Sequence, residues 1–160
     1  MKLSVIIPVY NTKNYIKECL DSVLNQTLEE IEIIVIDDGS TDGSADIIKE
    51  YAQNHPQKIK AFFKENGGQA TARNLALQKS NGEYLGFVDS DDWIDSDMYE
   101  KMYKTAKEEN ADIVICDMVD HYPTYDIYHH ASEFTDKFSV TPSACNKIFR
   151  REFVGDIKFP

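Results

Sequence analysis

The feature that most constrains the fold is a regular alternation of apolar, β-rich runs with segments of helical spacing. The runs start about every 27 residues, near Leu3, Ile31, Lys58, Tyr84 and Ile113. Strand, helix and strand at a steady interval predict βαβ units and a parallel sheet. The runs IEIIVI and ADIVIC are apolar enough to be covered on both faces. The predicted fold class is therefore α/β, a Rossmann-like, mostly parallel sheet flanked by helices.

This alternation stops after Met118. Residues 120–139 are polar and aromatic without a clear period, so we predict a long irregular loop there. A short strand around Lys147–Phe149 and a short helix are expected next. The 160 residues suit one domain, 1–160. Because no closing element precedes Pro160, we expect this domain to be truncated at its C-terminal end.

Charge and cysteine content narrow the possible partners and compartments. A formal charge of −11 excludes a nucleic-acid backbone as the main partner, but permits a nucleotide if a cation bridges the two anions. Three widely spaced cysteines, Cys19, Cys116 and Cys145, match no disulfide framework or metal motif. Inert thiols in a reducing, cytoplasmic compartment are the favoured interpretation. The run at 3–9 is too short to span a membrane, so we expect any membrane association to be peripheral, at the inner face.

Polar, glycine-bearing and acidic residues follow four of the predicted strands. Ligands of open α/β sheets bind outside the carboxyl ends of the strands. The segments in that position are 8–11, 37–40, 65–69 and 89–91. We therefore expect the binding site along this edge.

The stretch GFVDSDDWIDSD places five carboxylates close together after an apolar run. Asp89 and Asp91 are two residues apart, so both side chains can point to one side. Oxygen ligands in such a pair suit Mg²⁺ or Mn²⁺ together with substrate phosphates. Alternatively, the acids cap a helix that opens near Ser96, which is the interpretation we adopt for Asp95 and Asp97.

Two further segments contribute candidate binding residues. Asp37 and Asp38 are neighbours, so only one of them is expected to face a ligand. Gly67 and Gly68 allow close backbone approach, and the helix that follows them offers N–H groups to an anion. Arg73 lies in the first turns of that helix, where the helix dipole disfavours a cation. It contacts either an anionic ligand or a nearby acid, and both alternatives stay open.

Polar aromatic residues in the irregular segment have simpler interpretations. The histidines lack metal-ligand spacing and are interpreted as solvated: His121, His129 and His130. The tyrosines form either a sugar-stacking wall or the packing of the loop, and we favour packing: Tyr122, Tyr125 and Tyr128.

Four blocks make the chain recognisable. SVIIPVYN, IEIIVIDDGSTDGS, NGGQATARNLAL and GEYLGFVDSDDW together resemble the nucleotide-binding half of the family 2 inverting glycosyltransferases, which have the GT-A fold. The resemblance covers about Leu3 to Asp120 and is weaker in ACNKIFRREF. It implies that residues 1–118 form the nucleotide-sugar-binding part and that residues 119–160 begin an incomplete acceptor-side part.

The resemblance also implies roles for individual residues. Asp38 would accept a hydrogen bond from the uracil N–H, and Arg73 would lie near the nucleotide. Asp91 would be the direct metal ligand, with Asp89 closer to the ribose or a metal-bound water. The nucleoside pocket would be lined by Pro8, Val9, Tyr10 and Asn11, with Gly68 as a further substrate-binding residue.

The implied activity is transfer of a sugar, with inversion, from a nucleoside diphosphate donor to an acceptor hydroxyl. The donor would be a UDP-sugar, the cofactor Mn²⁺ or Mg²⁺, and the acceptor a carbohydrate or glycolipid in polysaccharide or glycoconjugate synthesis. The family's base is an Asp or Glu in a segment that we expect beyond Pro160, so the catalytic base is unknown and this chain should transfer sugar poorly. Alternatives are a non-catalytic nucleotide- and metal-binding module and a Mg²⁺-dependent receiver- or phosphatase-like domain.

Overall fold

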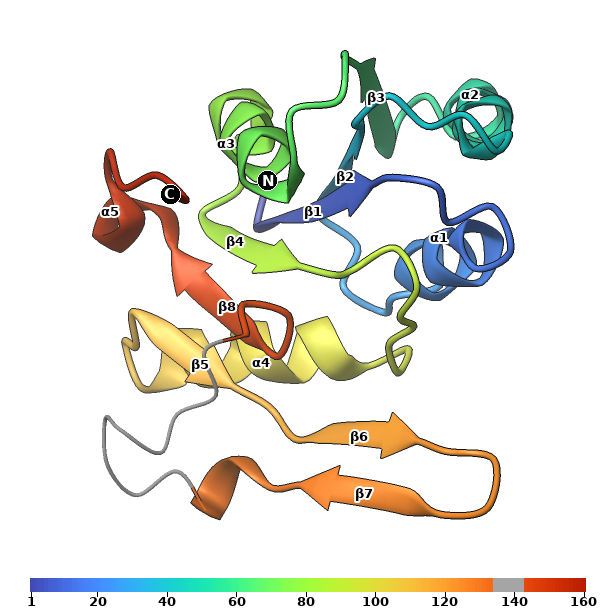
Figure 1. Cartoon of the computed structure of the whole chain (residues 1–160). Helices are drawn as coiled ribbons and strands as arrows, with labels where there is room; N and C mark the ends of the chain where they lie inside the picture. The colour runs from blue at the N-terminus through green and yellow to red at the C-terminus, as the bar shows by residue number, and fades with distance from the viewer. Residues whose placement is uncertain (134–142) are drawn as a thin grey trace.

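The structure, a computed structural model, describes residues 1–133 and 143–160. Every predicted strand is present, and only β3 begins one residue later than predicted. The elements follow the chain in this order (Figure 1): β1 (Leu3–Val9), α1 (Ile16–Leu24), β2 (Ile31–Asp37), α2 (Ser44–Asn54), β3 (Ile59–Phe63), α3 (Gln69–Lys79), β4 (Tyr84–Phe87), α4 (Met98–Glu108), β5 (Ile113–Ile115), β6 (Met118–His121), β7 (Asp126–His129), a 3₁₀ turn (Ala131–Glu133), β8 (Lys147–Arg150) and α5 (Arg151–Val154).

The central sheet has the strand order β3-β2-β1-β4-β8-β5. The first four strands in this order are parallel, whereas β8 is antiparallel to both β4 and β5. The predicted α/β fold with a mostly parallel sheet is therefore confirmed. The short strand predicted near residue 147 is also present, but it enters between β4 and β5 (Figure 1), a position that the sequence did not indicate.

Helices cover both faces of the sheet. Val5 and Ile7 of β1 face one hydrophobic cluster, which includes residues of α1, α2 and α4. Ile6 faces the opposite cluster, which includes Ala72 and Ala76 of α3. All residues of β1 and β2 are buried, because parallel strands in the centre of such a sheet are covered on both sides.

The irregular loop predicted for residues 120–139 is wrong for its first part, and residues 134–139 lie outside the described ranges. Strands β6 and β7 pair as an antiparallel hairpin apart from the main sheet (Figure 1). Its side chains are exposed or half-buried, so the strands carry no alternation of apolar and polar residues. Cross-strand neighbours stabilise it instead, as where the His121 ring contacts the Asp126 carboxylate at 2.8 Å.

The acids predicted to cap the fourth helix lie at its N-terminus, but their carboxylates form no cap hydrogen bond. Helix α4 begins at Met98 with Asp97 at the N-cap position, but the Asp97 side chain forms no cap hydrogen bond, and the Gln26 side-chain oxygen accepts the Tyr99 N–H instead, at 3.0 Å. The Asp97 carboxylate pairs with Lys101 one turn later, at 2.6 Å. Asp95 contributes its backbone carbonyl, which accepts the Met98 N–H. None of the helices in the described ranges is long and apolar enough to cross a lipid bilayer.

Candidate functional site

The loops that follow β1, β2 and β4 meet at one edge of the sheet, because these strands run parallel. Backbone and side-chain bonds hold the loops together. The Asp38 N–H donates to the Val9 carbonyl at 2.8 Å, and the Thr12 and Ser90 hydroxyls are 3.0 Å apart. Between these loops and the start of α3 lies a cavity of about 510 Å³, which we call the smaller cavity.

Most of the predicted binding residues line the smaller cavity. These are Pro8, Val9, Tyr10, Asp38, Gly68, Asp89 and Asp91. Of the other lining residues, Asn66, Gln69 and Ser90 lie in segments predicted at this edge but were not named as binding residues, whereas Thr12 and Ala72 lie outside those segments. Asn66 and Gln69 flank the glycine pair, so the same segment carried a signal for them.

Asp38 accepts three hydrogen bonds at this edge. Its carboxylate is buried, with 3% of the residue exposed. Oδ1 accepts the Gly67 N–H at 3.0 Å and a hydrogen bond from the Lys64 ammonium, and Oδ2 accepts the Gly68 N–H at 2.8 Å. A carboxylate has about four acceptor positions, so one position, on Oδ2, is left for a ligand. Lys64 was not predicted, although it follows β3 at the same edge.

Asp37 faces away from the smaller cavity, as expected for the neighbour of Asp38. Its Oδ2 accepts the Ser40 N–H at 3.3 Å. Its Oδ1 is buried and finds no hydrogen-bond partner in the described part of the chain. The two adjacent acids therefore have different environments, and only Asp38 is placed to contact a ligand.

Arg73 does not line the smaller cavity but supports its wall. Its guanidinium pairs with the Asp89 carboxylate at 2.9 Å, and the Gln69 amide donates to the same oxygen at 3.1 Å. The guanidinium also lies over the rings of Phe87 and Phe159, with centroid distances of 6.0 and 5.2 Å. Of the two alternatives for Arg73, pairing with an acid is the one seen here, and it orients Asp89.

Asn11 connects two loops rather than lining the cavity. Its φ angle of 54° lies in the left-handed region, which asparagine tolerates better than most residues. Its N–H donates to the Ser40 hydroxyl at 3.0 Å, and its side-chain oxygen accepts the Thr41 N–H at 2.8 Å. Asn11 thus fixes the loop after β1 against the loop after β2.

Asp91 is suited to a hard divalent cation. Its exposed carboxylate forms no hydrogen bond or ion pair within the described ranges, so its oxygens are available as ligands. Burial raises the pKa of neighbouring Asp92, and the charges of Asp91, Asp89 and Asp120 raise it further, which reflects concentrated negative charge. Mg²⁺ and Mn²⁺ accept one or two carboxylates and complete their shell with phosphate and water oxygens. In the part of the chain that is described, no three His, Cys, Asp or Glu residues form a complete cage, so the fit is to a shared, open site.

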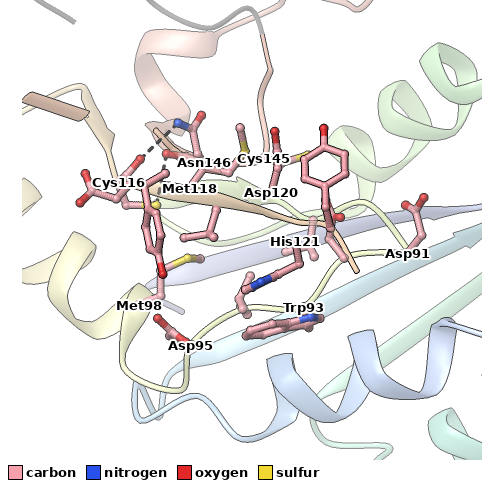
Figure 2. Close-up of a pocket in the computed structure, with 17 residues that line it drawn as sticks. Asp91, Trp93, Asp95, Met98, Cys116, Met118, Asp120, His121, Cys145 and Asn146 are labelled. Atoms are coloured by element: carbon pink, nitrogen blue, oxygen red, sulfur yellow. Dashed lines mark hydrogen bonds between the residues drawn. The ribbon is translucent and has the colours of Figure 1, made fainter. Parts of the chain in front are cut away.

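A second cavity, of about 740 Å³, adjoins the first, and Asp91 lines both. We call it the larger cavity. It lies between the loop after β4 and the β6–β7 hairpin (Figure 2). Five carboxylates line it: Asp91, Asp92, Asp95, Asp117 and Asp120.

Aromatic rings form another part of this wall. The Trp93 indole stacks on the His121 ring, with centroids 5.3 Å apart and an angle of 14° between planes (Figure 2). Tyr122 and Tyr128 also line the cavity. Tyr122 stacks on Tyr125 at 4.8 Å as well, so the tyrosines both pack the hairpin and face the cavity.

The histidines and cysteines of this region are not arranged as metal ligands or nucleophiles. Each histidine predicted as solvated contacts an aspartate: His121 with Asp126, His129 with Asp120 and His130 with Asp117. Burial raises the pKa of Cys116 to about 11 and that of Cys145 to about 12. Both thiols are therefore protonated near neutral pH, as is Cys19, whose pKa burial also raises.

Comparison with known proteins gives a consistent result. The family model described as Glycosyl transferase family 2 matches residues 4–157. Glycosyltransferase GlyA of Streptococcus pneumoniae is 47% identical over 114 residues, which are 71% of this chain and 16% of that protein. Putative glycosyltransferase EpsH of Bacillus subtilis is 45% identical over 134 residues, which are 84% of this chain and 35% of that protein.

Solved structures show the same fold. Residues 1–349 of S. aureus TarS, crystallised with UDP-GlcNAc, match with a TM-score of 0.86 and 31% identity, over 100% of this chain and 49% of that one. The mannosyltransferase PcManGT from Pyrobaculum calidifontis, in complex with GDP-Man and Mn²⁺, matches with a TM-score of 0.74 and 26% identity, over 96% of this chain and 45% of that one. The chain thus spans about half the length of these structural neighbours and less of the two sequence relatives. The predicted family resemblance and GT-A fold are confirmed.

Proposed function

Because the chain belongs to glycosyl transferase family 2, we propose that it forms the donor-binding part of an enzyme that transfers a sugar from a nucleoside diphosphate to an acceptor hydroxyl with inversion. We choose a UDP-sugar as donor because TarS, which is 31% identical, was crystallised with UDP and with UDP-GlcNAc. A carbohydrate or glycolipid acceptor would place the reaction in polysaccharide or glycoconjugate synthesis. We further propose a cytoplasmic location with at most peripheral membrane contact.

The bonding of Asp38 is the observation that carries this proposal. Three donors hold its carboxylate rigidly at the wall of the smaller cavity and leave one acceptor position on Oδ2. A uracil ring presents one N–H beside its carbonyl groups, so it suits a single acceptor of this kind. Pro8, Val9 and Tyr10 supply apolar surface in the same cavity for the base and ribose.

The diphosphate would lie toward Asp91. The open oxygens of Asp91 would hold Mn²⁺ or Mg²⁺, with Asp89 oriented by Arg73 for the ribose or a metal-bound water. When bound, the cation supplies charge stabilisation for the departing diphosphate. Without it, this acidic edge would repel a nucleoside diphosphate.

The acceptor would enter through the larger cavity, which adjoins the donor site at Asp91. Its hydroxyl would attack the anomeric carbon from the side opposite the diphosphate. A base must remove the hydroxyl proton. We propose that this base is an Asp or Glu outside residues 1–160, as the sequence analysis predicts.

Calorimetry with UDP, GDP and CDP, each with and without Mn²⁺, tests the proposal. We expect UDP to bind most tightly and only with Mn²⁺. Asp91→Asn should weaken UDP binding at least tenfold in Mn²⁺, which corresponds to about 1.4 kcal/mol. The matched control is Asp46→Asn, which removes the same charge from an exposed residue of α2 that pairs with Lys49. If Asp91→Asn binds UDP and Mn²⁺ like the control, the site assignment is wrong.

A further inference from the structure

The wall of the larger cavity has one sign of charge. Five aspartates line it, and none of its lining residues in the described ranges is a lysine or arginine. Asp117 stays ionised, because the Ala131 N–H and then His130 lower the pKa of its carboxyl. A divalent cation at Asp91 would itself be offset by the donor diphosphate. The cavity therefore stays negative when donor is bound, and a second anion placed there would be repelled.

The same wall offers exposed ring faces. Trp93 is 49% exposed, and His121 stacks on one of its faces. Tyr128 is 60% exposed at the opposite strand of the hairpin. An exposed aromatic face beside hydrogen-bond acceptors suits a ligand that has apolar C–H faces and many O–H or N–H donors. Sugars have this combination, and an ammonium group on a sugar would gain from both the rings and the carboxylates.

We propose that the larger cavity selects a non-anionic carbohydrate acceptor, either neutral or amino-bearing, which stacks on Trp93 and donates hydrogen bonds to the surrounding carboxylates. This inference rests on the proposed function and adds the class of the acceptor. Phosphate-bearing polyols and uronic-acid sugars are disfavoured, because their charge would meet the aspartates directly.

Trp93 also provides the assay. It is the single tryptophan of the chain, so intrinsic indole fluorescence reports on this cavity alone. The 160-residue protein, saturated with UDP and Mn²⁺, is titrated with three disaccharides of equal length. These are N,N′-diacetylchitobiose, its deacetylated form, which carries ammonium groups, and a disaccharide of glucuronic acid and N-acetylglucosamine. We expect the first two to bind at least tenfold more tightly than the third.

Two variants separate charge from stacking. Asp95→Asn lies in the cavity wall, and the Asp95 side chain forms no hydrogen bond or ion pair with other described residues, so the fold should be unaffected. The double variant Asp92→Asn/Asp95→Asn should reduce the ratio of the affinity for the neutral disaccharide to that for the uronate disaccharide at least threefold. Trp93→Ala, followed by ligand-observed NMR, should weaken the neutral disaccharide at least fivefold. Asp46→Asn, which removes one charge outside the cavity, is the control for Asp95→Asn, and it should change neither the preference for the neutral over the uronate disaccharide nor the affinity for the neutral disaccharide.

Two results would overturn the inference. One is binding of the uronate disaccharide as tight as, or tighter than, that of the neutral one. The other is the absence of saturable binding for all three sugars. Calorimetric measurement of UDP binding distinguishes failure of the acceptor class from failure of the proposed function. If UDP and Mn²⁺ bind normally but the sugars do not discriminate, the acceptor class alone is wrong, whereas loss of UDP binding would overturn the proposed function itself.

Discussion

Replacing Asp38 with asparagine tests the central contact of the site. The amide keeps one acceptor oxygen, but its –NH₂ group must face either the Gly68 N–H or both the Gly67 N–H and the Lys64 ammonium. The variant therefore loses the ion pair with Lys64 and one charge-assisted bond from the turn at Gly67 and Gly68. Hydrogen bonds to charged groups contribute about 1.5–3 kcal/mol each.

The Lys64 side chain is 23% exposed, so water replaces part of the lost pairing. We therefore expect the free energy of unfolding to fall by the value of one to two such hydrogen bonds, about 3 kcal/mol. In a chain of this size each kcal/mol lowers Tm by about 2–4 °C, so Tm should fall by about 6–12 °C. The position left for the uracil N–H is disturbed as well, and UDP affinity should fall by about 10- to 100-fold.

Circular dichroism melting and UDP calorimetry measure the two effects. Asp37→Asn is the matched control, because it removes the same charge from the adjacent buried residue. Among the described residues, the Asp37 carboxylate accepts only the Ser40 N–H and one of its oxygens has no partner, so its replacement should change stability by less than about 1 kcal/mol. Equal loss of Tm in the two variants, or unchanged UDP affinity in Asp38→Asn, would refute the reasoning.

Three further predictions concern the stability of the sheet and the support of the site. Burial alone would raise the pKa of Glu32, but hydrogen bonds from Lys60 and other donors outweigh burial and lower that pKa. The ionised carboxylate therefore stabilises the fold at pH values above its unfolded pKa. This stabilisation is lost as the pH falls through the folded pKa. Glu32→Gln should therefore lower stability by roughly 2 kcal/mol at pH 7, with the difference from wild type shrinking in melts below about pH 4; a constant difference would contradict this. Gly39→Ala should destabilise the protein by roughly 1–3 kcal/mol and weaken UDP binding, because Gly39 has φ +77° and a Cβ would lie 2.8 Å from the Asn66 nitrogen. A variant whose Tm and UDP affinity equal those of the wild type would argue against this. Phe159→Ala removes a ring that lies over the arginine of the Arg–Asp pair and should reduce UDP affinity severalfold in calorimetry, with Phe153→Ala, at an exposed residue of α5, as the control.

The predicted elements came from signals that are local in the chain. The apolar runs of β1 and β2 and the helical spacing between strands are properties of a few neighbouring residues, and they predicted these elements well. The same holds for the place of Asp38, Asp89 and Asp91, because the carboxyl ends of parallel strands share one edge. The β6–β7 hairpin was missed because both its faces are partly exposed, which removes the alternation that identifies a strand.

Order and spacing along the chain therefore determined the class of fold, the edge that carries the site and the acids at that edge. Only the tertiary structure decided how distant segments meet: β8 between β4 and β5, Lys64 on Asp38, and Phe159 over Arg73. The physical reason is the range of the interactions. Backbone preference and hydrophobic periodicity act between near neighbours, whereas the partner of a charge or a ring depends on packing that brings together residues far apart in sequence.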